Sequence, residues 1–290
     1  MRVALAAVIW FASTALAWAW GPLVTPEDDL SGALILDIRT LADFEAGHIP
    51  GAVNTPYALY RGPADNPGRV PALADLQTTL RAAGAAYDRD VLVVHAGADA
   101  TDFGAAARVY WTLKSAGFDR LAILNGGYGA WAANGAAPAT GVAVAEASEI
   151  TLSWSDAWMI DAEGVADVVA GETQAVLIDA RPLAFFEGDR KHGAAAEAGT
   201  LANALNIVHS TWFGDDGPIF AAPEEMLARV RAIAADNAGA PLVSFCNTSH
   251  WAATNWFAVS ELAGVADVKL YPESMVGWTR LGNAVVRGTN

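Results

Sequence analysis

The chain has 290 residues, of which 53% are hydrophobic, and a formal net charge of −15 at pH 7. This length exceeds one average domain and predicts two, with ample apolar residues for their cores. Because nucleic acids and anionic membrane surfaces repel an acidic protein, we expect neither as a partner.

The first 19 residues predict an export signal. Arg2 is followed by an apolar segment, residues 3–16, that is too short for a comfortable membrane span. The sequence ALAWA at its end fits the small-x-small pattern that signal peptidase reads. An uncleaved N-terminal anchor is the alternative, because the length of the segment is borderline. We expect cleavage and a periplasmic mature protein, if the source is a Gram-negative bacterium, with no membrane contact after cleavage.

Two segments of the chain repeat one pattern. The first reads ALILDIRTLADFEAGHIPGAVNTPY (residues 33–57), and the second reads AVLIDARPLAFFEGDRKHGAAAEAGTLANALNI (residues 175–207). With Asp37 aligned to Asp179, and ten extra residues allowed in the second copy, three further pairs match: Arg39 with Arg181, Phe44 with Phe186, and Asn54 with Asn206. An aspartate and an arginine separated by one residue at a strand end can pair and hold the following loop. We therefore expect both aspartate–arginine pairs to be structural.

A second pattern follows each of these segments, at residues 90–131 and 240–278. Each copy reads as a buried strand, a loop, an alanine-rich helix, a short strand and a glycine-containing turn that ends in tryptophan. Strands that alternate with helices predict an α/β protein of two tandem units, each a mainly parallel sheet with helices on both faces. The expected boundaries are 20–135 for the first unit, 136–156 for a linker with one strand at 149–154, and 157–290 for the second unit.

Cys246 is the only cysteine, so the chain cannot form an internal disulfide. It ends a short apolar run, and in parallel sheets the chemistry lies in the loops beyond the carboxyl ends of the strands. The loop at residues 246–251 precedes an expected helix at 252–262. Its backbone N–H groups and the helix dipole would favour a thiolate, lowering the cysteine pKa from about 8.5 to about 3.5–7.5. A buried, unreactive cysteine is the alternative.

Three motifs together resemble the rhodanese family: LDIRTLADFEAGHIPGAVN near the start, NGGYGAW at the end of the first unit, and CNTSHW in the second. The resemblance covers nearly all of the mature chain and implies two tandem rhodanese-like domains. It also implies that only the second domain is catalytic, because His95 stands roughly where Cys246 stands in the second copy. In this family the cysteine takes sulfur from a donor as a persulfide, and a nucleophilic acceptor then removes it.

The resemblance implies the partners of the reaction as well. The donor would be a small sulfur-containing anion such as thiosulfate or 3-mercaptopyruvate. The acceptor would be a thiophilic small molecule, such as cyanide, or a protein thiol. One cysteine is enough for that chemistry, so we expect no cofactor and no metal. The resemblance also places Glu273 and Ser274 near the active loop.

The expected site departs from the family at two points. Family loops place Arg and Lys, or small Gly and Ser, directly after the cysteine, whereas this chain has Asn247 and Thr248. Arg181 itself is expected either to bind the substrate or to anchor the loop. Family members have a further, anion-binding arginine four residues after the position of Arg181. That position is Phe185 here. Three groups could replace the missing charge: Arg190, Lys191 and a protonated His250.

Other residues of the cysteine loop have candidate roles. The hydroxyl groups of Thr248 and Ser249 could hydrogen-bond the sulfur or the oxygens of a donor. His250 could lower the pKa of the thiol or contact the acceptor, with a solvated loop histidine as the alternative. Trp251 could form a wall of the pocket, whereas we expect Trp256 to lie in the core.

Three other functions compete with sulfur transfer. Phosphatases of the same fold need the pattern C-x5-R, because the arginine clamps the phosphate; Ala252 stands at that position here, which excludes this function. A sulfane-sulfur carrier that serves a specific protein partner would be consistent with the departures from the family at Asn247 and Phe185. A purely structural binding module would fit an unreactive Cys246. Sulfur transfer through Cys246 is our prediction, and whether the first unit binds a ligand stays open.

Overall fold

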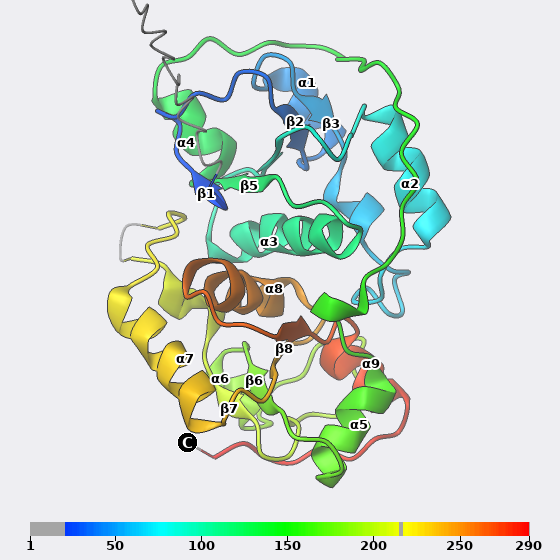
Figure 1. The fold of residues 1–290 in the computed structure, drawn as a ribbon, viewed down its shortest axis with the longest axis vertical. Helices are drawn as coiled ribbons and strands as arrows, with labels where there is room; N and C mark the ends of the chain where they lie inside the picture. The colour runs from blue at the N-terminus through cyan, green and yellow to red at the C-terminus, as the bar shows by residue number, and fades with distance from the viewer. Residues whose placement is uncertain (1–20, 215–216, 290) are drawn as a thin grey trace, which may run out of the picture.

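The computed structural model describes residues 21–214 and 217–289 as two stacked α/β units (Figure 1). The expected export signal, residues 1–19, lies outside the described residues. The first unit is built on a parallel sheet with the strand order β1-β5-β4-β2-β3. Its elements are β1 (Leu23–Val24), β2 (Leu34–Asp37), α1 (Leu41–Ala46), β3 (Val53–Asn54), the 3-10 helix η1 (Tyr57–Tyr60), α2 (Leu73–Ala82), β4 (Val91–Val94), α3 (Ala100–Ser115), β5 (Leu121–Leu124) and α4 (Gly127–Ala133).

The second unit is built on a parallel sheet with the strand order β7-β6-β8-β9. Its elements are η2 (Asp156–Trp158), α5 (Ala162–Ala170), β6 (Val176–Asp179), α6 (Leu183–Phe186), β7 (Leu205–Asn206), η3 (His209–Trp212), α7 (Glu224–Asp236), β8 (Leu242–Phe245), α8 (His250–Phe257), the π-helical continuation η4 (Ala258–Leu262), β9 (Val268–Leu270) and α9 (Ser274–Arg280). Among the described residues, we find no helix that combines the length and the apolar character needed to cross a membrane.

The two sheets repeat one arrangement. The order β5-β4-β2-β3 in the first unit corresponds to β9-β8-β6-β7 in the second. The predicted internal repeat and the α/β class with parallel sheets are therefore confirmed. The two expected glycine-containing turns differ from the prediction, because each leads into a short helix, α4 or α9, that contains Trp131 or Trp278.

Helices cover both faces of each sheet because the strands are apolar on both sides. In β2, Leu34 and Leu36 join one cluster of buried side chains and Ile35 joins another. The first sheet is covered by α2 and α3 on one face and by α1 and α4 on the other. The second sheet lies between α7 and α8 on one face and α5 and α9 on the other. The segments that follow the central strands β4 and β8 meet at the boundary between the units, where the Trp251 indole N–H donates to the Thr101 hydroxyl.

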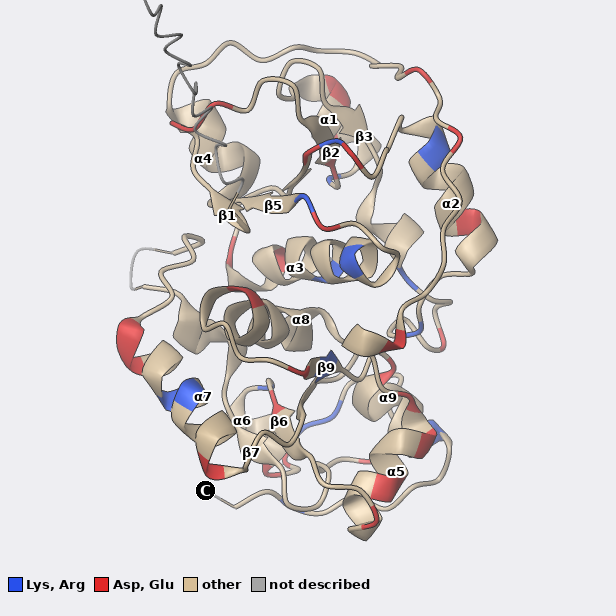
Figure 2. Cartoon of the chain, viewed as in Figure 1, with Lys and Arg blue, Asp and Glu red and all other residues tan. Residues whose placement is uncertain are grey.

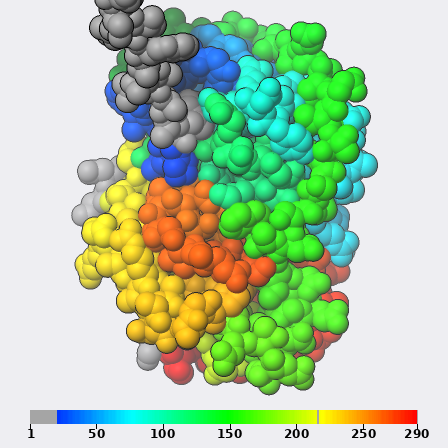
Figure 3. Space-filling model, in the orientation of Figure 1, coloured from blue at the N-terminus to red at the C-terminus, as the bar shows by residue number. Residues whose placement is uncertain are grey.

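One hydrophobic cluster runs through both units. Helix α3 packs against α8 between the two sheets, and the space-filling view shows the two units in contact along this boundary (Figures 1 and 3). The ring centroids of Tyr110 and Phe257 lie 5.1 Å apart across it. The carboxylate of Glu261 accepts hydrogen bonds of 2.8 Å from the Tyr110 hydroxyl and from the Lys114 ammonium group. The two units therefore share a core.

Charged residues are spread over both units, and basic residues also lie on α3 at the boundary (Figure 2). The arginine that follows β2 in the first unit, and the one that follows β6 in the second, each pair with the aspartate at the end of that strand at 2.6 Å. The same arginine donates a 2.8 Å hydrogen bond to the carbonyl of a glycine. The equivalent residues are Asp37, Arg39 and Gly47 in the first unit, and Asp179, Arg181 and Gly199 in the second. The ion pairs predicted at these two strand ends are present in both units.

The arginine and its glycine are 8 residues apart in the first unit and 18 in the second. The ten extra residues of the second copy therefore lie before Gly199. The strand expected at 149–154 in the linker is wrong, because this segment binds helix α2 instead of a sheet edge. The Arg81 guanidinium donates to the Ile150 carbonyl at 2.7 Å, and the Leu152 N–H donates to the Gln77 side chain at 2.9 Å.

Candidate functional site

Cys246 directly follows strand β8, and its side chain is almost fully buried, with 1% of its surface exposed. Its N–H donates to the Ser274 hydroxyl at 3.1 Å, and its carbonyl accepts the Met275 N–H at 3.0 Å. Ser274 in turn donates to the Tyr271 carbonyl at 2.8 Å. The start of α9 therefore holds the backbone of Cys246 in place, which agrees with the position that the resemblance implied for Ser274.

The cysteine loop turns back on the sulfur at Ser249. Ser249 has a left-handed backbone (φ 71°), which is uncommon for a residue other than glycine. Its N–H lies 3.1 Å from Cys246 Sγ. Helix α8 begins at His250, two residues earlier than predicted, so the helix N-terminus directly follows the group that contacts the sulfur. The hydroxyl of Ser249 donates to the Thr248 carbonyl at 2.7 Å and not to the sulfur.

The lowered pKa predicted for the thiol is not what the structure gives. Burial raises the pKa of Cys246 above its ordinary value, although the N–H groups of Ala252, Thr248 and Ser249 act in the opposite direction. The charge of Asp179 raises this pKa further. Desolvation outweighs the N–H groups because Cys246 is almost fully buried.

Arg181 contacts the cysteine loop through the side chain of Asn247. Besides its contacts to Asp179 and Gly199, its Nη1 lies 3.4 Å from the side-chain oxygen of Asn247. Arg181 is 1% exposed and Asn247 is 5% exposed. Of its two candidate roles, the contacts favour loop anchoring, because its donors are already directed at protein oxygens.

The aromatic residues after the cysteine lie at the boundary with the first unit. Trp251 stacks on His209 with 4.7 Å between ring centroids, and Phe185 meets the edge of Trp251 at 6.0 Å. The indole N–H of Trp251 donates to the Thr101 hydroxyl of the first unit at 3.1 Å. Trp256 is fully buried, with its N–H on the Val268 carbonyl at 2.8 Å, as the core position predicted.

His250 Nδ1 lies 3.3 Å from Nη1 of Arg61, a residue of the first unit. Burial and then the Arg61 charge lower the pKa of His250 to about 3. Burial also lowers the pKa of His209 to about 4 and that of His192 below its usual range. A protonated His250 is therefore not the missing cation at neutral pH, because desolvation and a neighbouring guanidinium both oppose its charge.

The other two candidates for that cation lie in the insertion. Arg190 is exposed, and its guanidinium carbon is 5.2 Å from the centre of the Phe185 ring. Lys191 is exposed as well, and its ammonium group donates to the carbonyls of Ala195 and Ala196 at 2.6 and 3.2 Å. Arg190 therefore lies near the aromatic margin of the site, whereas Lys191 is occupied within its own loop.

The first unit supplies residues that sequence reasoning missed. Arg61 donates to the Tyr57 hydroxyl at 2.6 Å as well as approaching His250. Tyr57 and His250 line one cavity of about 310 Å³, together with Asp99, Thr101, Asp102 and Ala105. Arg61 and His250 are 189 residues apart, and no local motif relates them. Correlated substitutions between the two repeats could have revealed the contact between Arg61 and His250, but a single sequence does not contain that information.

The equivalent loop of the first unit is filled by its own carboxylate. Asp102 accepts hydrogen bonds from the N–H groups of Gly97 and Ala98 at 2.7 and 3.0 Å. The same carboxylate oxygen lies 2.8 Å from Nδ1 of His95, the residue that stands in place of the cysteine. An anion that would otherwise bind these N–H groups therefore meets a carboxylate already in position.

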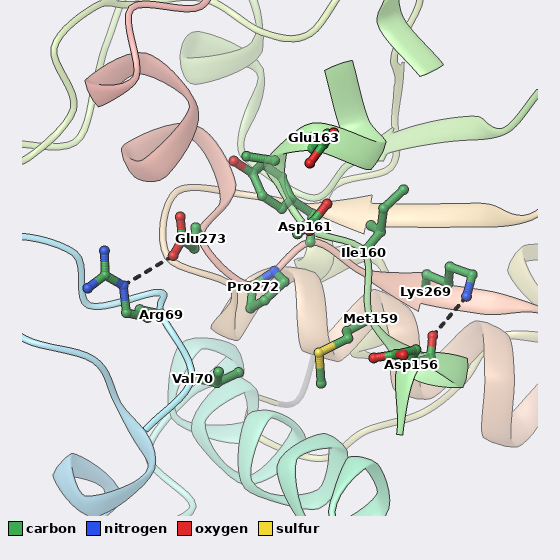
Figure 4. A pocket seen from close by; sticks show the side chains of 12 residues that line it. Arg69, Val70, Asp156, Met159, Ile160, Asp161, Glu163, Lys269, Pro272 and Glu273 are labelled. Carbon is green, nitrogen blue, oxygen red and sulfur yellow. Dashed lines mark hydrogen bonds and ion pairs between the residues drawn. The ribbon is translucent and has the colours of Figure 1, made fainter. Parts of the chain in front are cut away.

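A larger cavity, of about 610 Å³, lies elsewhere on the boundary between the units (Figure 4). Figure 4 shows Arg69 of the first unit bonded to Glu273, and Val70, Met159 and Pro272 among the other lining residues. Cys246 does not line this cavity. The smaller cavity is lined by His250 of the cysteine loop, whereas Glu273 lines the larger cavity.

Comparison with known proteins agrees with this architecture. The model of the rhodanese-like domain matches residues 19–134 and 162–281. SseB of Mycobacterium tuberculosis is 29% identical over 257 residues, covering 84% of this chain and 87% of that protein. A thiosulfate sulfurtransferase of Pseudomonas aeruginosa is 27% identical over 272 residues, covering 90% and 94% of the two chains.

The fold also matches a solved structure. The 3-mercaptopyruvate sulfurtransferase SseA of Escherichia coli has a TM-score of 0.72 at 21% identity, over 88% of this chain and 98% of that one. The predicted arrangement of two tandem rhodanese-like domains is thereby confirmed.

Proposed function

Since the chain belongs to the rhodanese family and is a sulfurtransferase, we propose that it moves sulfane sulfur from a small anionic donor to a nucleophilic acceptor through a persulfide on Cys246. The observation that supports this most directly is the setting of the thiol. The only cysteine ends a central strand, its sulfur accepts the Ser249 N–H at 3.1 Å, and a helix N-terminus follows at once. The proposed catalytic residue is Cys246 alone.

With thiosulfate as donor, the Cys246 thiolate attacks the outer sulfur. A new S–S bond forms to Cys246 while the S–S bond of thiosulfate breaks, and sulfite leaves with the bonding electron pair. The charges balance, because thiolate and thiosulfate become persulfide anion and sulfite. A cyanide ion then attacks the outer sulfur of the persulfide, leaving thiocyanate and the original thiolate. The protein's N–H groups stabilise the anionic sulfur at both stages.

Burial shapes how this site would be used. Because burial raises the pKa of Cys246, the thiol must lose its proton against a desolvation cost before it can attack. A sulfur that is 1% exposed also favours small acceptors over a folded partner that must touch it directly. A carrier that hands sulfur to one protein partner stays the alternative, with a donor other than free thiosulfate or 3-mercaptopyruvate.

The test is intact-protein mass spectrometry after incubation with thiosulfate, and separately with 3-mercaptopyruvate. We expect a gain of one sulfur atom with at least one donor and its loss on adding cyanide. Cys246→Ser is the control, and it should gain none while keeping the far-UV circular dichroism of the parent. Sulfur uptake by that variant would refute the mechanism. No uptake by the parent, on a thiol that still alkylates, would instead favour the carrier.

We also propose the division of the chain into residues 20–135, a linker at 136–156, and residues 157–290, preceded by an export signal at 1–19. The composition of the first 19 residues supports the signal, as argued above. The mass of the mature protein, purified from the periplasm of a Gram-negative host, tests it. A mass that includes all 290 residues would contradict cleavage.

A further inference from the structure

Two arginines of the first unit lie at the cysteine loop without a carboxylate partner. Arg108, in helix α3, is 0% exposed, and Arg61 is half-buried. Within residues 21–214 and 217–289, no ion pair joins either guanidinium group to an acidic side chain. An unpaired buried charge is costly, so an arrangement of two neighbouring guanidinium groups implies an anion that they bind.

Arg108 is directed at the loop by its place on α3. Thr101, Gly104 and Arg108 are three and four residues apart, so they share one face of the helix. Thr101 binds Trp251, and a Cβ atom on Gly104 would lie 2.9 Å from the His250 carbonyl oxygen. This face of α3 therefore packs on the start of α8, directly after the cysteine loop.

Some N–H donors of the Arg108 guanidinium group have no acceptor among the described residues. Nη2 donates to the Gly68 carbonyl at 2.9 Å, but Nε and Nη1 are buried and have no hydrogen-bond partner among the described residues. A Cβ atom on Gly68 would lie 2.3 Å from the Pro272 carbonyl oxygen, so this loop packs just before Ser274, which holds the backbone of Cys246. Arg108 is thus bonded to a loop that packs on the segment just before Ser274.

Arg61 contacts Tyr57 and His250, and the charges of Arg61 and Arg108 both act on Tyr57. Nη1 of Arg61 bonds the Tyr57 hydroxyl at 2.6 Å and approaches His250 Nδ1 at 3.3 Å, and its guanidinium carbon lies 5.1 Å from the Tyr57 ring centre. Tyr57 and His250 line the 310 Å³ cavity, and Arg61 itself lines a separate cavity of about 460 Å³, through which a small anion can reach its guanidinium group.

We propose that Arg61 and Arg108 of the first unit together bind the oxyanion head of the sulfur donor, and so replace the arginine that is missing at Phe185. This inference rests on the proposed function, because it names the donor site of the same reaction. It makes the cysteine-free unit a specificity-determining part of the second unit's site. The donor class that this arrangement selects is a small dianion such as thiosulfate, since two cations meet one head group.

The electrostatics of the cluster agree with this geometry. Burial lowers the pKa of Arg108 to about 9, and the charges of Tyr57 and Cys246 oppose that shift, while Arg61 adds to it. Arg108 therefore stays charged at neutral pH, close enough to Cys246 and Arg61 for their charges to interact. Two like charges held together are relieved by a bound anion, which favours donor binding over an unoccupied pair.

The test separates the two half-reactions of the transfer. In steady-state assays with thiosulfate as donor and dithiothreitol as a neutral acceptor, kcat/KM for each substrate reports one half-reaction. We expect Arg61→Gln and Arg108→Gln each to lower kcat/KM for thiosulfate by about tenfold or more, as the loss of a hydrogen bond to a charged group implies. The value for dithiothreitol should not change.

Two arginines serve as matched controls. Arg69→Gln removes an exposed guanidinium from the loop that follows Arg61, where it pairs with Glu273, and it should change neither value. Arg190→Gln removes the competing candidate near Phe185. If Arg190→Gln lowers kcat/KM for thiosulfate while Arg61→Gln does not, the proposal is wrong. Equal losses in both half-reactions would also overturn it, because the arginines would then act on the persulfide and not on the donor.

Calorimetry distinguishes this proposal from the function on which it rests. Thiosulfate should bind Cys246→Ser, and adding Arg61→Gln should weaken that binding; this measurement also covers the case in which Arg108→Gln does not fold. If the parent forms no persulfide but this binding pattern holds, the sulfur-transfer proposal fails and the anion site stands. If persulfide forms and Arg61→Gln binds thiosulfate normally, the anion site fails alone.

Discussion

The repeated aspartate–arginine pairs allow one substitution to be tested against its own duplicate. Arg181→Lys keeps the positive charge but replaces a planar fork with a single ammonium group. Arg181 donates to both oxygens of Asp179 and to the Gly199 carbonyl, and one ammonium group cannot keep all of these contacts. Hydrogen bonds to charged groups contribute about 1.5–3 kcal/mol each, so losing one or two should lower the free energy of unfolding by about 2–4 kcal/mol.

Arg39→Lys is the matched control, because Arg39 makes the same contacts to Asp37 and Gly47 in the first unit. Urea unfolding should give a similar loss of free energy for both variants. Only Arg181 also approaches Asn247, the residue after the cysteine, at 3.4 Å. Since a displacement of about 1 Å in a catalytic group can cost about 100-fold, Arg181→Lys should load sulfur more slowly, and Arg39→Lys should load it at the parent rate.

The assay is the rate of persulfide formation by mass spectrometry, measured where circular dichroism shows both variants fully folded. Equal slowing in the two variants would mean that reduced stability, and not the position of the loop, limits the reaction. Sulfur loading by Arg181→Lys at the parent rate would refute the idea that this arginine positions the cysteine loop.

Two further predictions concern the histidine beside Trp251 and the carboxylate of the first unit. Burial lowers the pKa of His209 to about 4, so the unfolded chain, with a value near 6.5, binds more protons between these values. The contribution of neutral His209 to stability is complete above pH 6.5 and falls by about 2 kcal/mol from pH 7 to pH 5. In urea unfolding, His209→Asn should lack this pH-dependent loss of stability. A variant with the same pH dependence as the parent would contradict the prediction. Asp102→Ala should cost about 2–3 kcal/mol by leaving the N–H groups of Gly97 and Ala98 without an acceptor. Sulfate should then raise the melting temperature of this variant but not of the parent, and equal effects on both would show that the loop does not bind anions.

The sequence predicted the repeated fold because the pattern that forms it is local. Apolar runs ending in Asp37 and Asp179 gave strands that the structure pairs in the same register with their neighbours, Asn54 and Asn206. The position of the ten-residue insertion also followed from that alignment, and the bond to Gly199 agrees with it. The strand expected in the linker was wrong because polar atoms of helix α2, and not an open sheet edge, satisfy that backbone.

Only those features of the candidate site that arise within one continuous segment of the chain could be predicted from the sequence. The place of Cys246 and the N–H contact of Ser249 followed from a strand, a loop and a helix in succession. The direction of the shift in the thiol's pKa did not, because it depends on how deeply the folded protein buries Cys246. Nor did Arg61 and Arg108 suggest themselves, since a charge on a distant repeat becomes relevant only when helices α3 and α8 are seen to pack together.

The shared core between α3 and α8 bears on why a duplicated domain without a cysteine persists. Separation of the units would expose Phe103 and Trp111 on one surface, and Trp256 and Phe257 on the other. Each such side chain costs about 1.5–3 kcal/mol when it returns to water, which is a large part of the stability of a domain of this size. Natural selection for chemistry in the second unit therefore also preserves the first unit. A duplicated domain that has lost its catalytic residue is still required, because the other domain needs it to cover its apolar surface.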